Sequence, residues 1–84
     1  MILEFKTDTG SVFRLDRDTM QWERHLNGRM THGKLYTWPE TIEVGKRVWI
    51  FDTDPIAKIG KAFATSKVVS ITSIDRAKPD VAAD

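Results

Sequence analysis

Two short apolar runs in the second half of the chain constrain its fold more than any other feature. Val48–Phe51 and Val68–Ile71 are its densest hydrophobic segments, and together they are rich in Val, Ile, Trp and Phe. β-Branched and aromatic side chains suit a pleated and largely buried strand. The sequence therefore predicts two central strands within residues 42–74, with shorter strands gathered around them.

Length and composition limit the classes of protein that fit. Eighty-four residues, 40% apolar and 30% charged, correspond to one globular domain and exclude extensive disorder. The chain has no Cys, which excludes disulfides and thiol catalysis and points to a reducing compartment. It lacks a run of ~20 apolar residues, and its start does not resemble a signal peptide. We therefore expect a cytoplasmic protein with no membrane partner.

The first third of the chain alternates between apolar and polar residues. Residues 2–6 and 11–16 read as a hairpin around a turn at 7–10, with Phe5, Phe13 and Leu15 facing inward. Residues 20–26 alternate again, and Trp22 is the expected core anchor. A helix over 19–27 is the alternative, but apolar residues spaced by two favour a strand.

The remainder divides into a loop and two or three further strands. Residues 27–41 are irregular, with turn signals at Asn27-Gly28 and Gly33, although 34–38 could form an edge strand. The strand at 47–51 ends at Asp52–Pro55, and 56–60 reads as a loop or a turn of helix. We expect further strands at 61–64 and 68–74, with a tight turn at 65–67 between them and with Val69 and Ile71 facing inward.

These segments predict an all-β fold. Five or six short strands, punctuated by turns, favour a small antiparallel barrel over residues 1–75, because closure removes exposed sheet edges. Residues 76–84 read as a flexible C-terminal tail. The alternative is an open antiparallel sheet with one short helix across it.

Two resemblances accompany this reading. The strand VGKRVWI at 44–50, the turn TSK at 65–67 and the final VVSI resemble an SH3-like barrel, which implies a short helical turn at 65–67 before the last strand. The hairpin Phe5–Leu15 and the Thr-Ser-x-Val segment at 65–68 resemble short uncharacterised reading frames of actinobacterial phages. The phage resemblance implies a protein that acts in the host-cell cytoplasm by binding a host macromolecule, and it brings no active-site residues.

No motif predicts catalysis. Asp52 and Asp54 could hold a divalent metal, but Pro55 favours a strand-ending turn instead. The residues Glu23, His25 and His32 could bind zinc only if the 27–41 loop folded back onto that strand. The chain contains neither a nucleophile elbow nor a glycine-rich phosphate loop. We therefore expect no enzyme, no cofactor and no metal.

The leading functional hypothesis is a non-enzymatic protein-interaction module. Residues 29–38 gather aromatic, Met and basic side chains, which protein interfaces favour. The predicted partner-binding residues are Arg29, Met30, His32, Lys34, Leu35, Tyr36 and Trp38. The last three could instead form a lid over one end of the barrel. In the phage context, the partner would be a host or phage protein.

Two alternatives come from other classes. A basic surface with a stacking aromatic, Tyr36 or Trp38, could bind nucleic acid, although nearby acidic residues and a net charge of +1 weaken it. Its basic residues would be Lys34, Lys46, Arg47, Lys58, Lys61 and Lys67. Alternatively, the chain is a phage structural component that forms homo-oligomers through a barrel edge.

Overall fold

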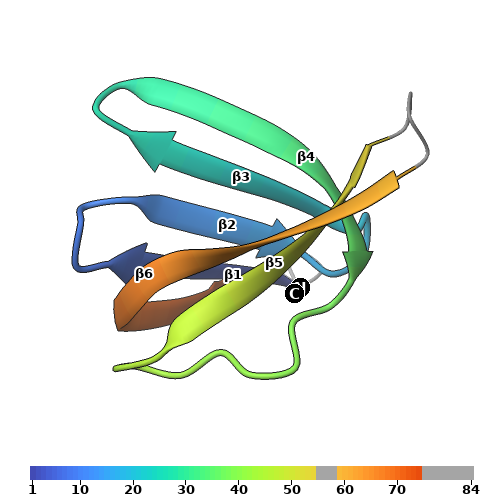
Figure 1. Ribbon diagram of the computed structural model, residues 1–84. Helices are drawn as coiled ribbons and strands as arrows, with labels where there is room; N and C mark the ends of the chain where they lie inside the picture. Colours follow the sequence, from blue (N-terminus) through green and yellow to red (C-terminus); the bar gives the residue numbers. More distant parts are fainter. Residues whose placement is uncertain (55–58, 75–84) are drawn as a thin grey trace, which may run out of the picture.

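The chain folds into a closed antiparallel barrel. The computed structural model describes residues 1–54 and 59–74. These residues form six strands that neighbour one another in chain order, and the first and last pair to close the barrel (Figure 1). The strands are β1 (Ile2–Thr7), β2 (Val12–Asp16), β3 (Gln21–Leu26), β4 (Arg29–Thr37), β5 (Arg47–Asp54) and β6 (Ile59–Ile74). The predicted all-β barrel is confirmed, and its architecture is compatible with an SH3-like barrel.

The core is made by side chains from every strand. Phe5 and Phe13 stack across the β1–β2 pair with ring centroids 5.1 Å apart. The predicted strand at 20–26 is confirmed as β3, and it delivers Trp22 to the interior. The buried cluster consists of Phe5, Phe13, Leu15, Trp22, Leu35, Val48, Ile50 and Val68. Period-2 alternation in the sequence thus identifies most of the interior correctly.

The prediction of an irregular loop at 27–41 is wrong for most of its length. Residues 29–37 form β4, which pairs with β3 from Arg29 opposite Leu26 to Lys34 opposite Gln21. Asn27 and Gly28 make the connecting turn, both with positive φ (52° and 76°), as expected for this dipeptide in a tight hairpin. Pairing with β3 compensates for the weak strand propensity of β4.

The predicted tight or helical turn at 65–67 is also wrong. These residues lie inside β6, a strand of 16 residues, and the described part of the chain has no helix. Trp49 is opposite Ala64 and Arg47 is opposite Lys67, so β6 carries an extra residue there. At this bulge the Val48 amide bonds to a side chain, because it donates a 3.0 Å hydrogen bond to the buried hydroxyl of Thr65.

A second irregularity explains why Val69 does not face inward as predicted. Thr7 of β1 is opposite Val68, whereas Lys6 is opposite Ser70, so Val69 has no counterpart in the ladder. Val68 is consequently buried, and Val69 is 53% exposed. Ile71 packs against the core as expected. The predicted tail at 76–84, and residues 56–58 of the predicted loop, lie outside the described residues.

Trp22, Gly33 and Asp52 connect three neighbouring strands. Trp22 is opposite Gly33 in the β3–β4 ladder, and its indole Nε1 donates a 2.9 Å hydrogen bond to Asp52 Oδ1 on β5. A Cβ at residue 33 would lie 2.5 Å from that oxygen and 2.7 Å from the indole nitrogen. Gly33 is therefore not a turn residue. Its missing side chain lets the indole cross β4.

We expect Gly33→Ala to destabilise the barrel. Overpacking of this kind costs about 1–3 kcal/mol, whereas Gly→Ala in an ordinary strand gains about 0.5–1 kcal/mol. Urea unfolding of Gly33→Ala, with Thr31→Ala on the same strand as a control, measures the difference. A variant as stable as the wild type would show that the indole does not need this gap.

Val68 and Val69 form a matched pair for testing the β6 bulge. Val68→Thr should lower the free energy of unfolding by about 1–3 kcal/mol, because it buries a hydroxyl. Val69→Thr should change it by no more than about 0.5 kcal/mol, as is usual for a surface position. Equal losses in thermal or urea unfolding would contradict the assigned register.

Candidate functional site

Two hairpins of the closed barrel diverge beyond the contact between β4 and β5. β4 pairs with β5 only between Lys34–Thr37 and Phe51–Thr53. Beyond this contact the β3–β4 hairpin and the β5–β6 hairpin run in different directions, toward the upper left and the upper right of Figure 1. Among the described residues, 29–33 therefore have no strand partner on the β5 side. We refer to this stretch as the open edge of β4.

Backbone groups of the open edge point away from β3 at alternate residues. The Leu35 amide donates a 2.7 Å hydrogen bond to the Met20 carbonyl, which fixes the phase of the β3–β4 ladder. Narrow and wide pairs alternate along an antiparallel ladder. The amide and carbonyl groups of Met30 and His32 consequently face the open side, where another extended chain could bond to them.

A groove of about 400 Å³ lies beside the open edge. Its lining comes from β3, β4, β5 and β6, namely Gln21, His32, Gly33, Lys34, Asp52, Thr53 and Lys61. Lys34 and Lys61 form no ion pair with any described residue. One oxygen of Asp52 is already bonded to the Trp22 indole. With two lysines and one carboxylate, the lining of the β4 groove, as we call it, carries a net positive charge, which favours an anionic ligand.

The predicted partner-binding residues divide between this surface and the core. His32 and Lys34 line the β4 groove, while Met30 and Tyr36 are 52% and 73% exposed. Arg29 is also exposed, at the end of β4 nearest the hairpin turn. Leu35 is only 6% exposed and belongs to the core. Tyr36 projects because it is the extra residue of a bulge between Leu35 and Thr37.

Trp38 has a mainly structural environment. Its ring packs against the core cluster and is half-buried. The Arg17 guanidinium carbon lies 5.2 Å from the ring centroid, which is within the range of a cation–π contact. Of the predicted aromatic set, only Tyr36 presents most of its surface to a partner.

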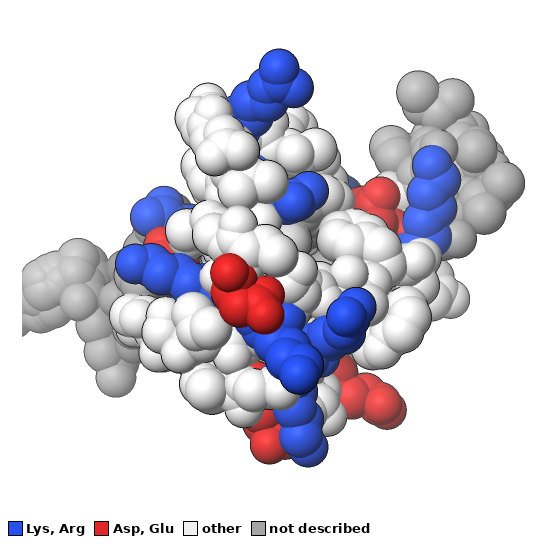
Figure 2. Space-filling view, turned by 60° about the vertical axis from the view of Figure 1, so that its left-hand side comes forward, with Lys and Arg blue, Asp and Glu red and all other residues white. Residues whose placement is uncertain are grey.

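The basic residues proposed for nucleic-acid binding do not form one surface. Lys34 and Lys61 line the β4 groove, whereas Arg47 and Lys67 are opposite one another near the start of β5. About 20 Å of strand separates Arg47 from Thr53 beside the groove. Figure 2 shows Lys and Arg side chains spread among uncharged surface, with acidic ones interspersed. Lys58 lies outside the described residues.

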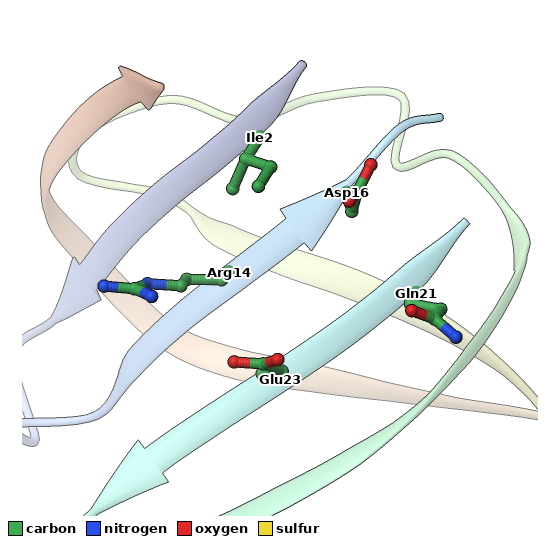
Figure 3. A pocket seen from close by; sticks show the side chains of 5 residues that line it. All are labelled: Ile2, Arg14, Asp16, Gln21 and Glu23. Atoms are coloured by element: carbon green, nitrogen blue, oxygen red, sulfur yellow. The ribbon is translucent and has the colours of Figure 1, made fainter. Parts of the chain in front are cut away.

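A second pocket, of about 140 Å³, lies on the outer face of β1–β3, and its charged side chains have partners outside the pocket lining (Figure 3). Arg14 extends from β2 toward β1, where its Nε donates a 2.7 Å hydrogen bond to Glu4 Oε1. Asp16 Oδ1 accepts bonds from the amides of Asp18 and Thr19, which builds the β2–β3 turn. Because these charges already have partners, the pocket offers little to a charged ligand.

The sequence suggests two sets of possible metal ligands, Glu23 with the two histidines and Asp52 with Asp54. Glu23 and His32 are opposite one another on β3 and β4, and Glu23 Oε1 lies 3.0 Å from His25 Nε2. Residues 1–54 and 59–74 contain no cluster of three or more His, Asp or Glu able to hold a metal ion. Asp52 serves instead as the acceptor for Trp22.

Five groove residues were not among the predicted partner-binding residues, namely Gln21, Gly33, Asp52, Thr53 and Lys61. Gln21, Thr53 and Lys61 come from three different strands, and only the pairing register brings them together. Lys34 is opposite Gln21 on one side and Thr53 on the other, and Lys61 is opposite Asp52. No local sequence pattern carries that information.

Comparison with known proteins adds no identification. No family model matches the sequence, and neither the curated proteins nor the solved structures contain a significant match. Within the described residues there is no helix with the length and apolar character needed to cross a membrane.

Tyr36 and Trp38 should respond differently to truncation. Trp38→Ala should cost about 1–3 kcal/mol of folding stability, less than the ~3–5 kcal/mol of a fully buried Trp, because the ring is half-exposed. Tyr36→Ala should change stability by no more than about 0.5 kcal/mol. Thermal unfolding of the two single variants tests this assignment, and a large loss for Tyr36→Ala would show that its ring packs on the barrel.

Proposed function

We propose that this barrel is a non-enzymatic protein-interaction module that captures an extended, acidic segment of a partner protein. The segment would add as a strand to the open edge of β4. The observation that carries the proposal is that residues 29–33, among the described residues, have no strand partner on the β5 side and lie beside a groove with two lysines. Strand addition uses main-chain hydrogen bonds for affinity and side-chain pockets for specificity.

The charge of the groove supports the choice of an acidic segment. Lys34 and Lys61 lack ion pairs among the described residues, and their flexible ammonium groups can reach a carboxylate on an added strand. A partner with Lys or Arg at the same positions would meet like charge, which disfavours it. Alternate side chains of the bound segment would face the groove, since side chains alternate along a strand.

Exposed Met30 and Tyr36 extend the contact surface at the two ends of the edge. Met and Tyr are enriched at protein interfaces, and Tyr is frequent among energetic hot spots. The proposed surface is therefore narrower than the whole 29–38 segment, because Leu35 is core and Trp38 packs against it. The resemblance to phage reading frames supports a host or phage protein in the host-cell cytoplasm as the partner.

Proline substitution tests strand addition directly. Random peptides displayed on yeast would be selected against the full chain, and the binders measured on His32→Pro and His32→Ala. We expect acidic peptides whose affinity falls at least about tenfold on His32→Pro, which removes an open-edge amide, and much less on His32→Ala. Peptides that bind His32→Pro as well as the wild type would contradict strand addition.

Further controls separate the fold from the proposed site and the alternatives from one another. Thr31→Pro removes an amide that faces β3, so it should destabilise the barrel where His32→Pro does not. A single-stranded oligonucleotide that binds with a steep salt dependence, in place of any acidic peptide, would favour the nucleic-acid alternative. If the molecular mass in solution rises with protein concentration, and this rise is absent in His32→Pro, the occupant of the edge is instead a second copy of this chain.

A further inference from the structure

A pocket of about 120 Å³, separate from the β4 groove, lies beside the β1–β2 turn. It is lined by the β1–β2 turn and by β2, β3 and β6, and the two sites share no lining residue. Its polar groups are one guanidinium, from Arg24, and the hydroxyls of Thr9, Ser11, Thr65 and Ser66. Phe13 and Phe63 supply apolar walls. Any role for this pocket is therefore independent of the function proposed above.

Arg24 is half-buried and only partly satisfied. Its Nε donates a 3.2 Å hydrogen bond to Ser11 Oγ, and its guanidinium carbon lies 5.9 Å from the Phe13 ring centroid. No carboxylate of the described residues pairs with it, whereas Arg14 on the neighbouring strand pairs with Glu4. A guanidinium carries several N–H donors and no acceptor. The terminal nitrogens of Arg24 therefore remain available to a ligand.

The two serine hydroxyls of the pocket act as acceptors within the protein, so their O–H groups can donate to a ligand. Ser11 Oγ accepts the bond from Arg24, and Ser66 Oγ accepts a 3.2 Å bond from Thr9 Oγ1. Each serine thus retains a hydroxyl proton to donate. Thr65 is fully engaged, since it accepts from the Val48 amide and donates to the Ser66 carbonyl. A ligand that enters meets donors and a positive charge.

We propose that this pocket binds a single oxyanion group, a carboxylate or a phosphate. The terminal nitrogens of Arg24 would bond two of its oxygens, and Ser11 and Ser66 would donate to it. Paired N–H donors of Arg match the geometry of both groups. The pocket volume of about 120 Å³ is sufficient for such a group.

Titration of the full chain tests the site with defined probes. Sodium phosphate and sodium acetate would be added in separate NMR titrations, with sodium chloride at equal ionic strength as the control. We expect saturable shifts of the Arg24 Nε–H and Ser66 amide signals with at least one oxyanion and none with chloride. The oxyanion that saturates at the lower concentration identifies the class. Absence of saturable shifts with both would overturn the proposal.

Matched variants assign the binding to Arg24. Arg24→Gln should weaken the preferred oxyanion at least about tenfold, because charge-assisted hydrogen bonds are lost. Arg47→Gln removes an equal charge from an exposed position on β5 and should leave the affinity unchanged. Equal weakening in both would show non-specific attraction and overturn the site. Ser66→Ala, which keeps Arg24 in place, should weaken binding about fivefold, and an unchanged affinity would also count against it.

Discussion

The hydrogen bond from Trp22 to Asp52 across Gly33 is the contact on which the shape of this barrel depends. It joins β3 to β5 over an intervening strand, and it is possible only because residue 33 has no side chain. The same indole meets Phe63 of β6 edge to face, with ring centroids 5.4 Å apart. One side chain therefore links four consecutive strands at the point where β4 and β5 separate. Beyond this point the two hairpins are free to diverge.

That divergence produces both the open edge of β4 and the β4 groove. A barrel whose strands paired along their full lengths would have no unpaired backbone, because closure removes edges. Here β5 continues into the β5–β6 hairpin past the end of its contact with β4. The open edge thus arises where the pairing of β4 with β5 ends, while the buried cluster that includes Trp22 maintains the fold. This separation is the reason we expect substitutions at the open edge to leave the fold intact.

Alternation in the sequence predicts the barrel and most of its core, and it fails where an extra residue enters a strand. Phe13, Trp22, Val48 and Ile50 face inward as expected, but the bulge at Val69 reverses the local alternation, and that at Thr65 resembles a turn in sequence. Gly33 also reads as a turn signal, because its role depends on two side chains from other strands. The site is less predictable still. The sequence identifies His32 and Lys34 as candidate binding residues. Gln21, Lys61 and Arg24 could not be identified as pocket residues, because only the pairing register of the strands places them in a pocket.

Pairing of β1 with β6 has a consequence for how the protein is made. Ile2 is opposite Ile74, and Phe5 is opposite Ile71, so closure joins residues from the two ends of the described chain. In the meander from β1 to β4 each strand pairs with its neighbour in sequence, so these strands can form while synthesis continues. The other edge of β1 stays unpaired until residues 68–74 leave the ribosome. Contacts of such long sequence separation slow folding. During translation the nascent chain therefore exposes an unpaired strand edge, through which it is prone to aggregate with other chains.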